Sequence, residues 1–204
     1  MTSNDNETSA GFGEVEPRDD DDARLVALML RVREGDEAAF RDIVEATEDR
    51  LYGTIAKMLG GVEGAEDVAQ RVYLRIWQAR GRYERRSKFS TWMFSIMHRL
   101  VLNERRGRAR RSAVFYTPGA DETPRDPVSR DLPSGEASAA ELAAEIDAAL
   151  AALPDDQRTA MVLRRYDEMP YEEIAEILGT TVSAVKSLLF RARETLRLKL
   201  KNWL

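Results

Sequence analysis

The chain has 204 residues, of which 43% are hydrophobic and 33% charged, a composition typical of one or two globular domains. It contains no cysteine and one histidine, which excludes disulfides and thiolate metal sites, and we expect neither a metal nor a cofactor. No apolar run approaches the ~18 residues that span a bilayer, and no signal-peptide pattern is present, so we expect a soluble, unprocessed, cytoplasmic protein without membrane insertion.

The net charge of -5 hides an alternating pattern along the chain. Residues 1–22 carry eight acidic and one basic residue, residues 75–111 carry twelve basic and two acidic residues, and residues 179–204 carry six basic and one acidic residue. Two basic surfaces on an acidic body suggest a protein that touches a polyanion at two places. The alternative explanation is ordinary solvated helix faces.

The segments differ in composition as well as in charge. Residues 1–22 are polar and acidic and predict a disordered tail, because they cannot bury enough apolar surface to offset the entropy of ordering. Residues 113–140 hold four of the seven prolines and predict a flexible linker. Helical periodicity fills residues 23–112 and 141–204, and β alternation is absent. We therefore expect an all-α protein of two small helical domains joined by the linker.

Three helices are expected in the first domain. They run from about Asp36 to Leu59, from Ala65 to Ala79, and from Ser90 to Arg106 or beyond. The third helix carries large apolar side chains at spacings of three and four residues, which indicates a core-facing stripe. The stripe consists of Phe89, Trp92, Met93, Ile96, Met97 and Leu100.

The opposite face of this third helix is basic and polar. It presents Ser95, His98, Arg99, Asn103 and Arg106, after a loop rich in arginine and aromatic residues, "GRYERRSKFS". Cations that hold a backbone, combined with groups that stack on or bond to a base, favour single-stranded nucleic acid. The aromatic candidates for a base pocket are Tyr83 and Phe94. A basic membrane-surface helix is the alternative.

The second helix has an outward face that is polar with an apolar centre. This face consists of Asp67, Gln70, Arg71 and Leu74. Such a surface is suited to docking a partner protein.

The second domain contains the pattern of a helix-turn-helix. Gly179 can end one helix with a left-handed backbone, and Thr181 can cap the next. The next helix buries Val182, Val185, Leu189, Ala192 and Leu196 and leaves Ser183, Lys186, Ser187, Phe190 and Arg191 outward. This outward face is the one that a recognition helix presents to the major groove. An ordinary helical hairpin with a basic exterior is the alternative.

Three segments together resemble the extracytoplasmic-function (ECF) sigma factors, a branch of the bacterial sigma-70 family. "AEDVAQRVYLRIW" and "FSTWMFSIMHRLVLNERR" resemble two helices of the family's region 2, and "LPDDQRTAMVLRRYDEMPYEEIAEILGTTVSAVKSLLFRARETLR" resembles region 4. The resemblance implies that residues 23–112 are region 2 and residues 141–204 are region 4. It also implies a transcription initiation factor, not an enzyme, that binds core RNA polymerase and directs it to promoters.

The resemblance further implies roles for individual residues. Asp67, Gln70, Arg71 and Leu74 would bind the β′ clamp helices of core polymerase, and region 4 would contact the β flap; Arg71 stands where the family commonly has an acid. The minus-ten element would be captured and melted by Tyr83, Lys88, Ser95, His98, Arg99, Asn103 and Arg106. The minus-thirty-five duplex would be bound by Arg164, Tyr171, Glu172, Ser183, Lys186, Ser187, Phe190 and Arg191. An anti-sigma protein is an expected further partner.

Two other classes of function remain open at this point. A stand-alone helix-turn-helix regulator would use the second domain alone. An enzyme acting on nucleic acid is disfavoured, because the sequence shows neither a nucleophile and base pair nor a Gly-rich phosphate loop.

Overall fold

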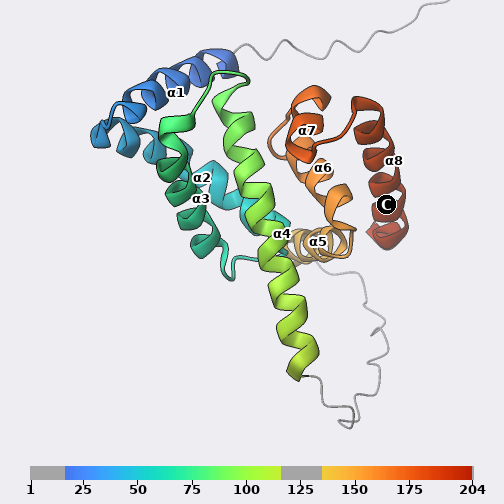
Figure 1. Cartoon of the computed structure of the whole chain (residues 1–204). Coiled ribbons are helices and arrows are strands. Elements are labelled where there is room, and N and C mark those ends of the chain that lie inside the picture. Colours follow the sequence, from blue (N-terminus) through green and yellow to red (C-terminus); the bar gives the residue numbers. More distant parts are fainter. Residues whose placement is uncertain (1–16, 116–134, 204) are drawn as a thin grey trace, which may run out of the picture.

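The structure is a computed structural model that describes residues 17–115 and 135–203, and every regular element in these two ranges is helical. The all-α prediction is confirmed. The α-helices are α1 (Pro17–Arg33), α2 (Glu37–Leu59), α3 (Ala65–Ala79), α4 (Phe89–Phe115), α5 (Gly135–Ala151), α6 (Asp155–Arg165), α7 (Tyr171–Leu178) and α8 (Val182–Lys199). Short 3-10 helices follow α3 (η1, Arg80–Arg82) and α8 (η2, Lys201–Trp203). Figure 1 shows α1 to α4 forming one half of the molecule and α5 to α8 the other.

Local signals define the ends of α2. The side chain of Asp36 accepts a hydrogen bond from the backbone N–H of Ala39 at 3.0 Å and caps the first turn. Gly60 ends the helix with a φ of 81°, in the left-handed region that suits glycine. The apolar face between these caps packs against α1 and α3, which builds the first half around the stripe expected on α4.

The helix-turn-helix forms as the sequence predicts. Gly179 ends α7 with a φ of 63°, and the Thr181 hydroxyl accepts from the backbone N–H of Ala184 at 3.2 Å to cap α8. Val185, Leu189 and Ala192 of α8 are buried, and α8 packs on α6 and α7. This packing determines which face of α8 is exposed to solvent.

The two halves also pack on each other, which the sequence did not predict. α4 lies between α1 to α3 on one side and α6 to α8 on the other (Figure 1), and it contacts α7. α2 contacts α5 and α6. Buried apolar side chains of both halves belong to one contiguous core.

The predicted boundaries of the tail and linker were too wide. α1 begins at Pro17, so the last part of the acidic segment is helical. Asp22 is 7% exposed and accepts from the backbone N–H groups of Phe89 and Ser90 at 3.0 and 2.9 Å, so this acid caps the N-terminus of α4. α4 continues to Phe115 and α5 begins at Gly135. The rest of the predicted tail and linker lies outside the described residues.

Candidate nucleic-acid and protein-docking surfaces

The outward face of α8 is exposed and basic. A shallow surface depression on this face is lined by Ser183, Lys186, Ser187, Phe190 and Arg191. Phe190 is 65% exposed, although a phenylalanine side chain is usually buried. An exposed aromatic beside two cations is consistent with contact to base edges and phosphates in a major groove.

The three other residues assigned to duplex contact lie on the two helices before α8, Arg164 on α6 and Tyr171 and Glu172 on α7. The Arg164 guanidinium lies 5.3 Å from the ring centroid of Tyr171 and donates to the carbonyl oxygens of Glu168 and Met169 at 3.3 and 3.0 Å. Glu172 is exposed in the first turn of α7. The structure therefore brings Arg164 and Tyr171 together and fixes the position of the arginine side chain.

The outward face of α3 forms a second shallow depression, and one of its residues, Glu104, was not predicted from the sequence. The depression is lined by Asp67, Gln70, Arg71, Leu74 and Glu104. Leu74 is 54% exposed. Glu104 comes from α4, and its carboxylate accepts from Arg71 at 2.9 Å; neither helix alone signals this pairing in the sequence.

Glu104 lies among arginines from both helices. It accepts from Arg111 at 3.1 Å and from Arg108 at 3.4 Å in addition to Arg71. The hydrogen bond from Arg71 is the main cause that lowers the pKa of Glu104, and Arg111 and Arg108 lower it further. The carboxylate therefore stays ionised and holds Arg71 against the side of α3.

The residues assigned to the minus-ten element fall into two groups. Arg99, Asn103 and Arg106 are exposed on α4, as the sequence predicts. Ser95 is half-buried and its hydroxyl donates to the Trp92 carbonyl at 2.7 Å. Lys88 is half-buried and forms an ion pair with Glu173 of α7 at 3.1 Å.

Two aromatic residues proposed for a base pocket are buried in the core, and this prediction was wrong for the described structure. Tyr83 is 3% exposed, and its ring lies 5.0 Å from that of Trp92 and 6.3 Å from that of Phe89. Burial, and the charge of Asp22, raise the pKa of Tyr83. Phe94 is fully buried, because α4 has packing partners on two sides and not only along the expected stripe.

His98 is also buried, which corrects its placement on an open DNA-facing surface. It is 7% exposed, and its Nδ1 lies 3.3 Å from the Thr159 hydroxyl of α6. Burial lowers the pKa of His98, partly opposed by the charge of Asp156. In this structure the second half of the molecule covers the histidine.

Within residues 17–115 and 135–203, no group of three or more histidine, aspartate or glutamate side chains has the arrangement of a metal site. In the same ranges no helix is long and apolar enough to cross a membrane.

Comparisons with known proteins identify both halves of the chain. Residues 43–111 match the family described as Sigma-70 region 2, and residues 143–196 match Sigma-70, region 4. The ECF RNA polymerase sigma factor SigW of Bacillus subtilis is 34% identical over 178 residues, which cover 85% of this chain and 95% of that protein. The RNA polymerase sigma-H factor of Pseudomonas aeruginosa is 31% identical, over 83% of this chain and 90% of its own length.

Solved structures give the same result for the fold. CnrH in complex with the cytosolic domain of CnrY is similar with a TM-score of 0.65 at 23% identity, covering 89% of this chain and 99% of CnrH. The sigma factor RpoE of Bartonella quintana, in complex with the anti-sigma factor NepR, has a TM-score of 0.60 at 25% identity, covering 79% and 96% of the two chains. From these matches, the chain belongs to the ECF sigma factors of the sigma-70 family, which are transcription initiation factors of RNA polymerase and not enzymes.

Proposed function

We propose that this sigma factor uses three exposed faces, one to bind core RNA polymerase and two to bind promoter DNA. The face of α3 around Leu74 binds core RNA polymerase at the β′ clamp helices, α4 contacts the opened minus-ten element, and α8 binds the minus-thirty-five duplex. The observation that carries the proposal is that two basic faces, on α4 and on α8, accompany a separate face with an exposed leucine at its centre. Residues 23–112 act as region 2, and we extend this region at its N-terminus to include all of α1, which begins at Pro17. Residues 141–204 act as region 4, which also contacts the β flap of core polymerase.

Melting of DNA requires that captured bases offset the cost of unstacking. Unstacking costs on the order of a few kcal/mol per base step. Arg99, Asn103 and Arg106 are exposed on α4 and can supply phosphate and base contacts, and the preceding loop adds Arg85 and Arg86, both exposed. This set replaces Tyr83 as the proposed contact with flipped bases.

Transcription with purified components tests the proposal as a whole. The templates carry DNA from upstream of the gene that encodes this chain. Transcripts with a discrete start should form when core polymerase is combined with the full chain, and they should not form with core polymerase alone. If no template in a broad set supports initiation, the proposal fails.

The role of α8 is tested with a pair of lysine variants. We expect Lys186→Ala to weaken recognition of the minus-thirty-five element by about 1–3 kcal/mol if the lysine contacts a base, and to weaken binding to all sequences alike if it contacts phosphate. Lys199 is exposed at the other end of α8, so Lys199→Ala is the matched control. Footprints on promoters altered at single positions separate the two outcomes.

The role of α3 is tested by placing a charge on its apolar centre. Leu74→Asp should weaken binding to core polymerase at least about tenfold, because a charge in the desolvated centre of an interface costs at least ~1.4 kcal/mol. Val62 is 67% exposed in the connection before α3, and Val62→Asp introduces the same charge outside the face. Equal affinities for the two variants would exclude this face as the docking site.

Location and regulation follow from the same proposal. A promoter-directed factor works in the cytoplasm with core polymerase, so we place this chain there. The relatives whose structures are similar are described in complexes, one of them with an anti-sigma factor, and we propose that an anti-sigma protein also restrains this chain. A stand-alone helix-turn-helix regulator is not favoured, because both regions of a sigma factor are matched.

A further inference from the structure

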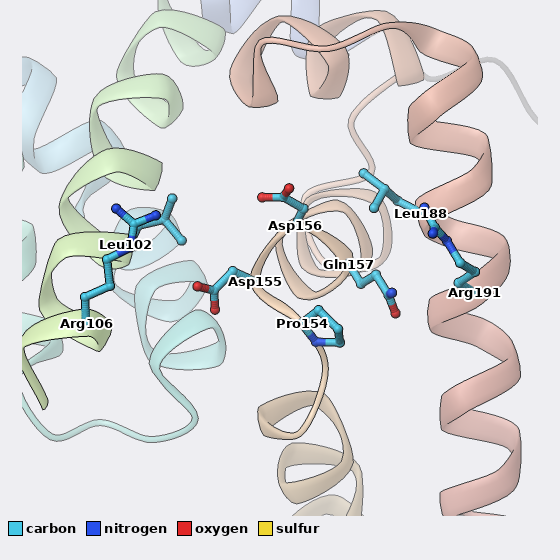
Figure 2. Close-up of a pocket in the computed structure, with 8 residues that line it drawn as sticks. All are labelled: Leu102, Arg106, Pro154, Asp155, Asp156, Gln157, Leu188 and Arg191. Carbon is cyan, nitrogen blue, oxygen red and sulfur yellow. The ribbon is translucent and has the colours of Figure 1, made fainter. Parts of the chain in front are cut away.

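The first turn of α4 lacks the local signals that begin other helices of the structure. Asp36 caps α2, and Thr181 caps α8. α6 carries Asp155 and Asp156 in its first turn, and Figure 2 shows both carboxylates at the start of that helix. The first turn of α4 contains no acid, and the residue before it is Lys88, whose side chain has no acceptor. α4 therefore needs hydrogen-bond acceptors from elsewhere in the fold.

A buried aspartate of α1 supplies these acceptors. One carboxylate oxygen of Asp22 accepts from the backbone N–H of Phe89 at 3.0 Å, and the other accepts from that of Ser90 at 2.9 Å. These two donors are among the four N–H groups that have no partner within the helix. The helix dipole also favours a negative charge at this end. The start of α4 therefore depends on the position of α1.

The same aspartate fixes one end of the loop that precedes α4. This loop, residues 84–88, runs between Tyr83 and Phe89, which are both buried and whose ring centroids lie 6.3 Å apart. α1 contacts η1, before the loop, and α4, after it. Arg85 and Arg86 are exposed between these two ends. The loop cations proposed for contact with opened DNA thus lie on a short segment whose ends are held by α1 and by the core.

We propose that Asp22 is a positioning residue for the opening of promoter DNA: by capping α4 from α1, it holds residues 84–88 in the conformation that binds the opened strand. The inference rests on the proposed contact of Arg85 and Arg86 with opened DNA. A capped loop is ordered before DNA binds, so binding costs less conformational entropy. Without the cap, only the molecules with an ordered loop are competent to bind, and the apparent dissociation constant rises as their fraction falls.

The test uses the full chain and compares three aspartates. Asp22→Ala removes both acceptors, and Asp22→Asn keeps one acceptor oxygen but removes the charge. Asp21→Asn removes the charge of an exposed neighbour and is the control for electrostatics. Asp36→Ala removes the cap of α2, a helix without proposed DNA contacts, and is the control for the stability that any lost cap costs. Circular dichroism verifies the helical content of each variant, and urea unfolding measures its stability.

Loop order and DNA binding are measured separately. Trypsin cleaves after arginine and lysine, and its rate of cleavage at Arg85, Arg86 and Lys88, with the sites identified by mass spectrometry, reports local opening of the loop. Fluorescence anisotropy measures the affinity of each variant for a fluorescein-labelled, single-stranded DNA oligonucleotide of mixed sequence.

We expect Asp22→Ala to speed cleavage within the loop and to weaken binding to the oligonucleotide by about fivefold, which is the change in an equilibrium constant that the loss of one helix cap typically causes. Relative to Asp21→Asn, Asp22→Asn should change both readouts in the same direction by less. Asp36→Ala should lose stability without either change. Asp21→Asn should bind slightly more tightly than the wild type, because it removes a negative charge.

Faster loop cleavage without weaker binding would overturn the positioning role, and unchanged cleavage in both Asp22 variants would overturn the claim that the cap holds the loop. An equal loss of affinity in Asp36→Ala would assign the effect to stability alone. If Asp22→Ala does not fold, Asp22→Asn decides, and affinity equal to that of Asp21→Asn rejects the inference. Transcription with core polymerase reports on the proposed function separately, so a wild-type chain that initiates transcription but does not bind the oligonucleotide would overturn the loop contact alone.

Discussion

Replacing Arg158 with methionine measures how much the structure depends on a cation buried between the halves. Arg158 of α6 is 2% exposed. It donates to the carbonyl oxygens of Leu150 and Leu153 at 2.7 and 3.3 Å, and to that of Met58 at 2.9 Å. Met58 lies in the last turn of α2, where carbonyl oxygens have no partner within the helix.

Two opposing effects set the size of the change. Burial, and to a lesser degree the charge of Arg105, lower the pKa of Arg158 to about 10, which still leaves it charged at neutral pH. The shift corresponds to about 3 kcal/mol of unfavourable desolvation and charge repulsion that methionine would relieve. Against this, three buried carbonyl oxygens lose their donor, at about 1–3 kcal/mol each. Methionine retains most of the apolar stem, so packing changes little. The net expectation is a loss of about 3 kcal/mol in the free energy of unfolding.

Urea unfolding followed by circular dichroism and by tryptophan fluorescence is the assay, since coincident transitions justify a single free energy. Arg165→Met, at an exposed position of the same helix, should change stability by no more than about 0.5 kcal/mol. If Arg158→Met is as stable as the wild type or more stable, the desolvation of the cation outweighs its hydrogen bonds and the reasoning is wrong.

Three further variants test the assignments of exposed and buried residues. Phe190→Ala should leave the free energy of unfolding within about 0.5 kcal/mol of wild type, because the ring is exposed, while a footprint at the minus-thirty-five element weakens by about 1–3 kcal/mol. Tyr83→Phe should raise stability by up to about 1 kcal/mol, because the buried hydroxyl has no hydrogen-bond partner among the described residues, and should leave affinity for single-stranded DNA unchanged; a loss of affinity would restore Tyr83 to the base pocket. Burial lowers the pKa of His98 below 6.5, so protonation favours the unfolded chain, and stability should be complete above about pH 6.5 and fall as the pH drops toward the lowered pKa. Since the chain has one histidine, the difference in urea midpoint between pH 7.5 and 5.5 should shrink in His98→Gln, and an unshrunken difference would reject this cause.

The sequence predicts those features that depend on neighbouring residues. The spacing of apolar residues on α8, its capping Thr181 and the turn at Gly179 all lie within about twenty positions, and all were correct. Phe94 and His98 were placed wrongly because periodicity along one helix identifies one buried face, whereas α4 is buried on two. The second partner of α4 lies far along the chain: Thr159 is 61 residues from His98, and no local pattern reports such a contact.

Composition misled in a similar way at the acidic N-terminal segment. A run of aspartates has low helix propensity and high charge, so it predicts disorder. Asp22 nevertheless becomes an N-cap for α4, 67 residues away in the sequence. Glu104 shows the same limit: its partner Arg71 lies on a different helix. The partner of each of these carboxylates depends on which helices the fold places beside it, and the neighbouring sequence does not report this.

Three ion pairs at the edges of the interface between the halves predict how salt affects the contact between them. The pairs Lys57–Asp147, Lys88–Glu173 and Arg105–Asp155 have partly exposed side chains, and each exposed pair contributes only about 0–1 kcal/mol. Screening lengths fall from about 10 Å at 0.1 M to about 3 Å at 1 M salt, so 1 M NaCl should weaken the contact between the halves by about 1–2 kcal/mol in total. Because the chain has no cysteine, Val62→Cys and Leu198→Cys, at two exposed positions in different halves, give unique sites for a fluorescent donor and acceptor, and energy transfer between them should fall at 1 M NaCl. Energy transfer that is unchanged across this range would show that apolar packing alone holds the halves together and that the ion pairs contribute nothing to the contact.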